Sequence, residues 1–431
     1  MAPAWPQGLT MKVVQVSVSD IKGGAAIAAF RLHQGLRQTG LESSMLVAEK
    51  YGRGDDNVVV SPDRIGYFSR RLHYRQLSAR FWRHAGSRPA GLSPFTGPGA
   101  RRNRKLVKRL SAADIINLHW IANFVDLPTI LARSAQPLVW TLHDMNAFTG
   151  GCHLTLDCEK YRKQCGACPQ LGSKSDRDVS REIWRIKHEI FQFAASGKLH
   201  LVAPSTWLAK QVERSSLLGN MPLSVIPNAL DITVFKPYDK FSAREQLGIP
   251  ATTRVLLFTA DVIDSQHKGL QYLLDALLGI DQSSDILLVT LGAGKTKPDT
   301  ELPVLGLGHL KDDRQIALAY SAADLFIIPS VQDNLPNTVM EAMACGTPVV
   351  GFDVGGIADM VRAGITGLLA PARDVRQLRQ AITDLLGNLP LRTEMAGNCR
   401  RITLSDYSLS VQAGRYIDLY QQLLDQQAAS C

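Results

Sequence analysis

Short apolar runs alternate with stretches of helical periodicity along most of the chain, and this alternation limits the fold more than any other feature. Lys12 to Val18 is rich in β-branched residues and leads through two glycines into Ala25 to Thr39, where apolar residues recur at helical spacing until Gly40. We predict a strand, a glycine loop and a helix. Seven further runs have the length of buried strands: Ile115 to Leu118, Leu138 to Leu142, Leu199 to Ala203, Val255 to Thr259, Ile286 to Leu291, Leu325 to Ile328 and Pro348 to Gly351.

Most of these runs are continuously apolar, which is typical of parallel strands that are covered by helices on both faces. The predicted fold class is therefore α/β with doubly wound, Rossmann-like parallel sheets. A chain of 431 residues is too long for one ordinary core, and the breaker-rich segment Val225 to Pro237 interrupts the alternation midway. We predict an N-terminal domain over residues 1–215, a C-terminal domain over residues 216–407, and a last helix over residues 408–431 that packs back towards the N-terminal domain.

Positive charge is concentrated in one segment of the chain. Of the 48 lysines and arginines, 13 lie between Pro62 and Leu110, where Asp63 is the one acid, so the net charge of +9 arises there. Nucleic acid is not expected as a partner, because its binders tend to carry positive charge over a wider surface. Aromatic residues alternate with the arginines, at Tyr67, Phe68, Tyr74, Phe81 and Trp82. We expect residues 62–110 to bind an anionic membrane surface; a solvated run of charges is the alternative.

Neither a membrane-spanning helix nor a signal peptide is expected from the sequence. Its apolar runs are much shorter than the roughly 20 residues of a membrane-spanning helix. The first ten residues lack the basic and apolar regions of a signal peptide. We therefore expect a cytoplasmic protein that is peripheral on the inner face of the plasma membrane. Met11, directly before the first strand, is an alternative start of translation to Met1.

The strongest cluster of chemical signals begins at Asp333. This residue follows a predicted strand, and Pro336 to Thr338 favour the start of a helix that contains Glu341. The free N–H groups and the dipole at such a helix start suit a phosphate. Both acids can reach a ligand that lies over the helix start. Capping of the helix by Asp333 or Asn337, with a solvated Glu341, is the alternative.

Two histidines each follow a predicted strand in the N-terminal half. His119 comes after Ile115 to Leu118, and His143 with Asp144 comes after the next strand. Ligands bind open α/β sheets at the carboxyl ends of strands, so these side chains indicate a polar site. A hydrogen-bonded structural role is the alternative for either histidine taken alone.

Four of the seven cysteines form a compact pattern, C-x5-C-x6-C-x2-C, in an insertion over residues 150–170. They are Cys152, Cys158, Cys165 and Cys168. Four thiolates with a closing C-x-x-C can surround one tetrahedral Zn²⁺, and the neighbouring glycines Gly150, Gly151 and Gly166 allow the turns that such a site needs. We expect structural zinc. Two disulfides, four reduced thiols, an iron–sulfur cluster, or His153 in place of one ligand are the alternatives.

Taken in order, these motifs resemble the retaining GT-B enzymes of glycosyltransferase family 4. The residues from Asp333 resemble the family's acid-x7-acid motif, and GGAAIAAFRL, TLHD, VIPNALD, HKGLQYLLDAL, SAADLFIIPS and VGGIADMV extend the likeness over most of the chain. The cysteine insertion resembles a subset from bacterial capsule and exopolysaccharide biosynthesis. The resemblance implies two Rossmann-like domains facing a cleft, with a nucleotide-sugar donor on the C-terminal domain and a lipid-linked glycan acceptor mainly on the N-terminal domain.

The resemblance also implies roles for single residues. His143 would contact the donor sugar or the acceptor near the reacting carbon, Glu341 the donor ribose, and Asp333 the hydroxyls of the donor sugar. Lys268 would neutralise the diphosphate, without a catalytic metal. Backbone atoms would cradle the phosphates at Gly23 and Gly24 and at Asn334, Leu335, Pro336, Asn337 and Thr338.

The sequence departs from the family pattern at two places. The family usually has Glu where this chain has Asp333, and an Arg shortly before Lys268, where this chain has Asp264 to His267. His267 is the expected partial substitute for that Arg. These departures leave open a sugar-nucleotide binding module without transfer activity. Another GT-B enzyme, such as an epimerase or a disaccharide synthase, is a further alternative.

Overall fold

The computed structural model describes residues 11–61, 84, 86–89, 92, 95–97, 104–194, 198–278, 280, 285–294, 300 and 302–430. These residues form two compact units. The N-terminal unit comprises Met1–Asn228 together with Leu409–Cys431, and the C-terminal unit comprises Ala229–Ser408. Most of the basic segment 62–110 and all of Met1–Thr10 lie outside the described residues, so the predictions made for them are not addressed by the structure.

The N-terminal unit contains a parallel sheet of seven described strands in the order β3-β2-β1-β4-β5-β6-β7. The strands are β1 Lys12–Ser19, β2 Glu42–Glu49, β3 Val58–Val60, β4 Ile115–Leu118, β5 Leu138–Thr141, β6 Leu199–Ala203 and β7 Leu223–Val225. Strand β7 pairs in parallel with β6, so the N-terminal unit extends to Asn228, beyond the boundary at residue 215 drawn from the sequence.

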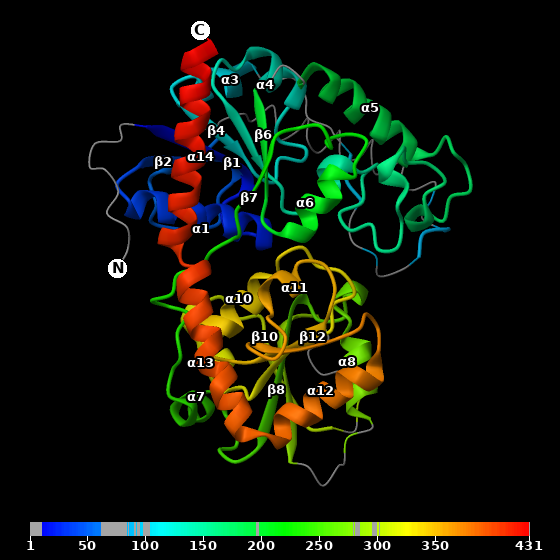
Figure 1. The fold of residues 1–431 in the computed structure, drawn as a ribbon, viewed down its shortest axis with the longest axis vertical. Coiled ribbons are helices and arrows are strands. Elements are labelled where there is room, and N and C mark those ends of the chain that lie inside the picture. Colours follow the sequence, from blue (N-terminus) through cyan, green and yellow to red (C-terminus); the bar gives the residue numbers. More distant parts are fainter. Residues whose placement is uncertain are drawn as a thin grey trace. The chain divides into compact units, whose positions relative to one another are not determined.

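Helices cover both faces of this sheet. They are α1 Gly24–Gln38, α3 Arg104–Leu110, α4 Leu127–Arg133, α5 Val179–Ala194, α6 Thr206–Glu213 and α14 Leu409–Ser430. Figure 1 shows α14 beside α1, and both pack on one face; α3 to α6 pack on the other. The hydroxyls of Tyr416 and Tyr420 on α14 lie 2.9 Å from Thr141 Oγ1 and Asn117 Nδ2. The C-terminal helix is thus part of the N-terminal unit's core.

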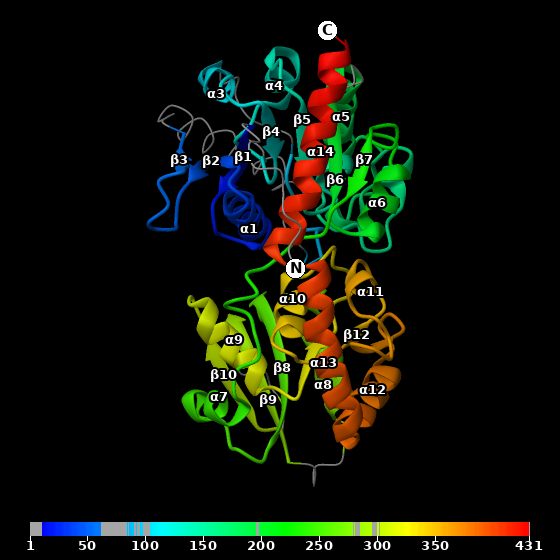
Figure 2. The same ribbon diagram turned by 60° about the vertical axis from the view of Figure 1, so that its left-hand side comes forward.

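The C-terminal unit contains a second parallel sheet, with six described strands in the order β10-β9-β8-β11-β12-β13. They are β8 Arg254–Val262, β9 Ile286–Ala293, β10 Val304–Gly308, β11 Leu325–Ile328, β12 Val349–Phe352 and β13 Gly367–Ala370. The helices are α7 Lys240–Leu247, α8 Leu270–Leu277, α9 Asp313–Ala322, α10 Asn337–Ala344, α11 Ile357–Met360, α12 Val375–Gly387 and α13 Leu389–Asp406. Helices α7, α9 and α10 cover one face, and α8 and α12 the other (Figure 2). The predicted α/β class with two doubly wound parallel sheets is confirmed.

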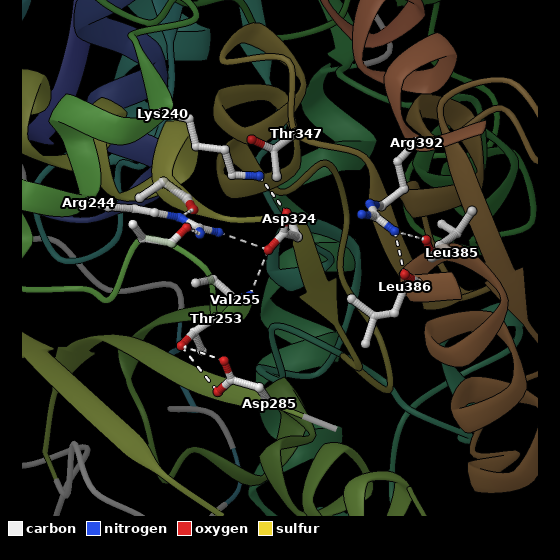
Figure 3. A network of polar contacts seen from close by, with 12 residues as sticks. Lys240, Arg244, Thr253, Val255, Asp285, Asp324, Thr347, Leu385, Leu386 and Arg392 are labelled. Carbon is white, nitrogen blue, oxygen red and sulfur yellow. Dashed lines mark hydrogen bonds and ion pairs between the residues drawn. The ribbon is translucent and has the colours of Figure 1, made fainter. Parts of the chain in front are cut away.

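A buried ion-pair network attaches α7 to the sheet of this unit. Asp324, just before β11, accepts hydrogen bonds from Lys240 Nζ at 2.5 Å, Arg244 Nη2 at 2.9 Å and the backbone N–H of Val255 at 2.7 Å (Figure 3). Burial raises the pKa of Asp324, but the Lys240 and Arg244 cations and the Val255 N–H lower it further, so that its net pKa lies below the ordinary value. Asp324 is therefore ionised and holds two cations against the strand.

No helix in the described part of the chain has both the length and the apolar character that crossing a bilayer requires.

Candidate active site

Two of the residues singled out from the sequence form an ion pair in the C-terminal unit. Lys268, at the end of the short 3-10 helix Gln266–Lys268, places its Nζ 2.7 Å from Oδ2 of Asp333, which follows β11. The other oxygen of Asp333 accepts the N–H of Asn334 at 3.0 Å. Burial lowers the pKa of Lys268, but the Asp333 carboxylate raises it by more, so the ammonium is charged. A fixed cation and a carboxylate thus lie together in the loop before α10.

Backbone contacts at two glycines hold this loop in place. Gly269 follows Lys268 with φ +74°, and an added Cβ would lie 1.9 Å from the carbonyl oxygen of Pro329. Gly355 has φ +59°, and an added Cβ there would lie 1.8 Å from the carbonyl oxygen of Asp333. That oxygen also accepts the N–H of Gly356 at 3.0 Å. Only glycine permits both the positive φ and these close approaches, so the VGG turn fixes the backbone of Asp333.

Helix α10 begins at Asn337 directly after this loop. Pro336 precedes the helix and provides no side-chain cap, and the first turn carries no acid. The alternative in which Asp333 caps the helix does not describe the structure, because its carboxylate pairs with Lys268 and Asn334. An uncapped helix start with a cation beside it favours an anion.

Glu341 lies one turn inside α10 and is buried, with 9% of its surface exposed. The hydroxyl of Tyr320, on α9, donates to its Oε2 at 3.3 Å. Burial and the Glu341 carboxylate both raise the pKa of Tyr320, so the phenol stays protonated and can donate. Glu341 is therefore a positioned acceptor, which excludes the alternative of a solvated side chain. Tyr320 was not singled out from the sequence, because nothing local distinguishes a tyrosine on the apolar face of a helix.

His267 cannot replace the missing arginine at neutral pH. Burial, followed by the neighbouring Lys268 cation, lowers the pKa of His267 to about 4. The ring is therefore neutral at pH 7, and its Nδ1 lies 2.8 Å from the hydroxyl of Ser265. The expectation of a partial cationic substitute is corrected: His267 offers a hydrogen bond without a charge.

In the N-terminal unit the two predicted histidines meet at the ends of β4 and β5. His119 Nδ1 lies 3.0 Å from His143 Nε2, and His119 Nε2 lies 2.8 Å from Oε1 of Gln15 on β1. Burial and the neighbouring His143 lower the pKa of His119 well below its ordinary value, and burial lowers that of His143 to about 4. Both rings are therefore neutral at pH 7. The Gln15 oxygen accepts from His119 Nε2, so His119 Nδ1 accepts from His143 Nε2, and the lone pair of His143 lies on Nδ1.

A cavity of about 210 Å³ opens beside His143. Its polar lining includes His119, Asp144 and Asn146, and its apolar lining comes largely from β5, α4 and α5: Ile121, Val125, Leu127, Trp140, Leu142, Ala147, Ile186, Ile190 and Phe191. Such a cavity, apolar with a few convergent polar groups, is typical of a binding site for a small organic group. Gln15 and the apolar lining were missed from the sequence, because they come together only through the strand order.

Gly23 and Gly24 lie at the start of α1 in the same unit. Gly23 has φ +91°, and an added Cβ would meet no atom within 4 Å, so space above the turn is open. The turn is held by the buried Asp20, whose carboxylate accepts the N–H groups of Ile21, Tyr51 and Gly52 at 2.8 to 2.9 Å. A second open helix start therefore follows β1.

The four predicted cysteines line one small cavity of about 20 Å³. All four are free thiols, and Cys158 is the most exposed of them. Within the described ranges, no group of three or more His, Cys, Asp and Glu side chains is arranged as a metal site. The disulfide alternative thus has no support from this structure, and the expected zinc ion stays a prediction.

Comparisons with known proteins follow the two units. Residues 22–234 match the domain described as Glycosyltransferase Family 4, and residues 253–388 match the domain described as Glycosyl transferases group 1. The first match begins in the N-terminal unit and continues past Asn228 to residue 234. The second lies within the C-terminal unit.

Curated relatives include WcaC of Escherichia coli, described as a colanic acid biosynthesis glycosyl transferase. It is 24% identical over 438 residues, with 96% of this chain and 100% of the relative covered. A D-inositol 3-phosphate glycosyltransferase of Mycobacterium tuberculosis is 32% identical over 294 residues, which cover 63% of this chain and 54% of that protein. The chain thus spans about half the length of the inositol phosphate glycosyltransferases that it matches.

Solved structures with the same fold cover nearly the whole chain. A sucrose-phosphate synthase from Thermosynechococcus elongatus superposes with a TM-score of 0.68 at 18% identity, over 96% of this chain and 100% of that one. Anabaena HepE, solved in complex with UDP and glucose, gives a TM-score of 0.66 at 18% identity, over 95% and 99%. These similarities establish the GT-B fold.

Proposed function

The chain carries the two domains of a family 4-like glycosyltransferase, and from this premise we propose that it transfers a sugar from a nucleotide-diphosphate donor to a lipid-linked glycan in cell-surface polysaccharide synthesis. The observation that carries the proposal is the Lys268–Asp333 ion pair before the uncapped start of α10, with Glu341 buried one turn inside. The names of two relatives support it: HepE was solved with UDP and with UDP-glucose, and WcaC is described in colanic acid biosynthesis.

The donor side follows from the charges that the reaction develops. Breaking the bond between the sugar and the diphosphate leaves negative charge on the phosphate and positive charge on the sugar ring. Lys268 and the N–H groups at the start of α10 stabilise the first. When the diphosphate forms an ion pair with the Lys268 ammonium, the carboxylate of Asp333 becomes available to the sugar hydroxyls. Glu341 accepts hydrogen bonds from the ribose.

We propose that transfer retains the anomeric configuration. The acceptor then attacks from the face that the phosphate leaves, and the leaving phosphate takes the acceptor proton. Neither Asp333 nor Glu341 is a nucleophile in this scheme. A double displacement through a covalent intermediate is the alternative, and an intermediate trapped on either acid would replace our scheme.

The acceptor side is the cavity beside His143. His143, Asp144 and Asn146 lie on the same lining, and these polar side chains can hydrogen-bond the hydroxyl groups of an acceptor. The remaining lining is largely apolar. A lipid-linked glycan has hydroxyl groups and an apolar part, so it suits both regions. Substitution of Ile190 by Trp would narrow this cavity and should raise the KM for the acceptor while the Kd of the donor stays unchanged.

The basic segment 62–110 supports a peripheral position on an anionic membrane, where each Lys or Arg near the surface adds about 1 kcal/mol. This proposal rests on the sequence, because most of the segment lies outside the described residues. Sedimentation with vesicles should rise with the fraction of anionic lipid, and equal binding to neutral vesicles would contradict it.

A thermal-shift screen against nucleoside diphosphates and their sugars identifies the donor, because a ligand that binds only the folded state raises the Tm. Once the donor is known, the reaction products distinguish the proposed glycosyltransferase from the competing functions. A binding module would be stabilised without releasing nucleoside diphosphate. An epimerase would change the donor sugar without an acceptor, and a disaccharide synthase would use a soluble sugar or sugar phosphate. Release that depends on a lipid-linked glycan supports our proposal.

A further inference from the structure

The residues between Gly150 and Leu171 form a loop that we call the cysteine loop. Its four cysteines come from separate turns, yet all of them line the same cavity of about 20 Å³. Cys152, Cys165 and Cys168 are buried, each with 7% to 8% of its surface exposed. Four free thiols converge in this way either as packing residues or as ligands of a metal.

Donor groups lie close to two of the sulfur atoms, although burial raises the pKa of Cys152, Cys165 and Cys168 above the ordinary thiol value. The backbone N–H of Gly150 donates to Cys165 Sγ at 3.1 Å. Lys187, on α5, is buried, and its ammonium donates to the carbonyl oxygens of Asn146 and Thr149 while interacting electrostatically with Cys152 and Cys165. A buried lysine is costly unless an anion compensates it. Asp144 is one such anion, and four thiolates around a divalent ion, with a net charge of −2, would add to it.

We propose that Cys152, Cys158, Cys165 and Cys168 bind one Zn²⁺ through their four sulfur atoms. A tetrahedral set of four sulfurs suits zinc or an iron–sulfur cluster. The cavity of about 20 Å³ has room for about one water-sized sphere, so its size suits a single ion better than a cluster of several irons and sulfides. Because the described thiols do not yet stand at ligand positions, they must turn inward to reach the Zn–S distance of about 2.3 Å.

Gly150, which lies two residues before Cys152, has no side chain and therefore leaves room for the thiols to turn inward. A Cβ added at Gly150 would lie 2.4 Å from the carbonyl oxygen of Ser180, and 2.7 Å and 3.0 Å from Cβ and Sγ of Cys165. A larger residue would therefore displace the Ser180 backbone, Cys165, or both. Glycine is thus required at this position because the backbone packs closely against Cys165, which is one of the four converging cysteines.

Three contacts connect the cysteine loop to residues 144–149, of which Asp144 and Asn146 line the cavity beside His143. Thr149 Oγ1 donates to the carbonyl oxygen of Cys152 at 2.6 Å, and Asn146 Nδ2 donates to that of Gly151 at 2.9 Å. His153 Nδ1 lies 3.1 Å from Oδ2 of Asp144. Zinc would therefore position Asp144 and Asn146. This second consequence rests on the proposed function, whereas metal binding itself does not.

Metal analysis of the purified full-length chain tests the site. We expect about one zinc per chain, and loss of most of it in Cys158→Ser, which alters the most exposed of the four cysteines. The matched control is Cys399→Ser. Cys399 is a buried free thiol on α13 of the other unit that donates to the carbonyl oxygen of Thr366 at 3.2 Å, and its serine variant should keep the zinc.

Cobalt provides a readout that does not depend on activity or on variants. Chain purified from cobalt-supplemented cells should show the sulfur-to-cobalt charge-transfer absorption and the intense visible bands of a tetrahedral thiolate site. Wild-type protein with less than about 0.1 metal ion per chain would overturn the proposal. So would stoichiometric iron with sulfide, or thiol titration of unreduced protein that reveals two disulfides. If removal of zinc left the KM for the acceptor unchanged, this result would overturn only the role of zinc in positioning Asp144 and Asn146.

Discussion

The ammonium of Lys268 lies 2.7 Å from the carboxylate of Asp333, although 65 residues separate them in the sequence. The residue expected to bind the donor diphosphate is thus paired with the residue expected to bind the donor sugar. Each is about four-fifths buried, with 24% and 17% of its side chain exposed. The pair keeps both groups charged and in place before a donor arrives, so donor binding exchanges one ion pair for another.

We predict that Lys268→Ala weakens nucleoside diphosphate binding by about 10- to 100-fold, the usual size of a lost hydrogen bond to a charged group. Lys268→Arg keeps a cation and should recover part of that affinity. Calorimetric titration measures both values. Equal affinity in Lys268→Ala and wild type would show that the diphosphate binds elsewhere.

We predict that Gly355→Ala impairs donor binding through the backbone of Asp333. Its Cβ would lie 1.8 Å from the Asp333 carbonyl oxygen, so the loop before α10 must move. The matched control is Gly364→Ala, because Gly364 also has positive φ, at +79°, but an added Cβ meets no atom within 4 Å. Both variants should lose about 1 kcal/mol of stability from the positive φ, and only Gly355→Ala should lose nucleotide affinity. The same affinity in both variants would contradict the role of the turn.

Stability should fall on acidification well before the carboxylates titrate. Burial lowers the pKa of His143 and of His267 to about 4, and it lowers that of His119 well below its ordinary value. Between the unfolded pKa of 6.5 and these folded values, the unfolded chain binds more protons than the folded chain, so the free energy of unfolding decreases as pH falls. Urea titrations at pH 7.0, 6.0 and 5.0 measure this decrease. His143→Gln should reduce the slope, and a flat profile would contradict neutral buried rings.

Asp324→Ala should destabilise the C-terminal unit by about 3–5 kcal/mol, because it leaves the buried Arg244 without its carboxylate. Asp285→Ala is the control, since Asp285 is exposed and accepts only the Thr253 hydroxyl in the network of Figure 3. The control should cost about 1 kcal/mol. Denaturant unfolding measures both, and similar losses would show that the Asp324 network is not a principal support of this unit.

Most interior strands were predictable because burial on both faces requires continuous apolar runs. Ile115–Leu118, Leu199–Ala203 and Leu325–Ile328 have the predicted bounds. The interior strand β2, whose sequence ESSMLVAE begins with polar residues, was missed, and so were the edge strands β3, β7, β10 and β13. An edge strand is paired on one side only and can be short or contain glycine, as in VLGLG at β10 and GLLA at β13. Local pattern therefore identifies the core of a parallel sheet better than its margins.

The candidate site was predictable where a motif is local and not where it depends on strand order. Asp333 and Glu341 belong to one segment, and the four cysteines belong to another. Gln15 and His119 are 104 residues apart and meet because β1 and β4 are neighbours. The neutral state of His267 follows from its burial, which no spacing reveals.

The central claim is that this chain transfers a sugar from a nucleotide donor, and proton NMR of the reaction tests it most directly. Full-length protein is incubated with the donor found by thermal shift and with a lipid-linked glycan extract. We predict that nucleoside diphosphate appears together with a glycoside of the donor's anomeric configuration. Glu341→Gln should bind the donor about 10- to 100-fold more weakly, because a charged acceptor is lost. Absence of nucleoside diphosphate release with every donor that binds would contradict the account.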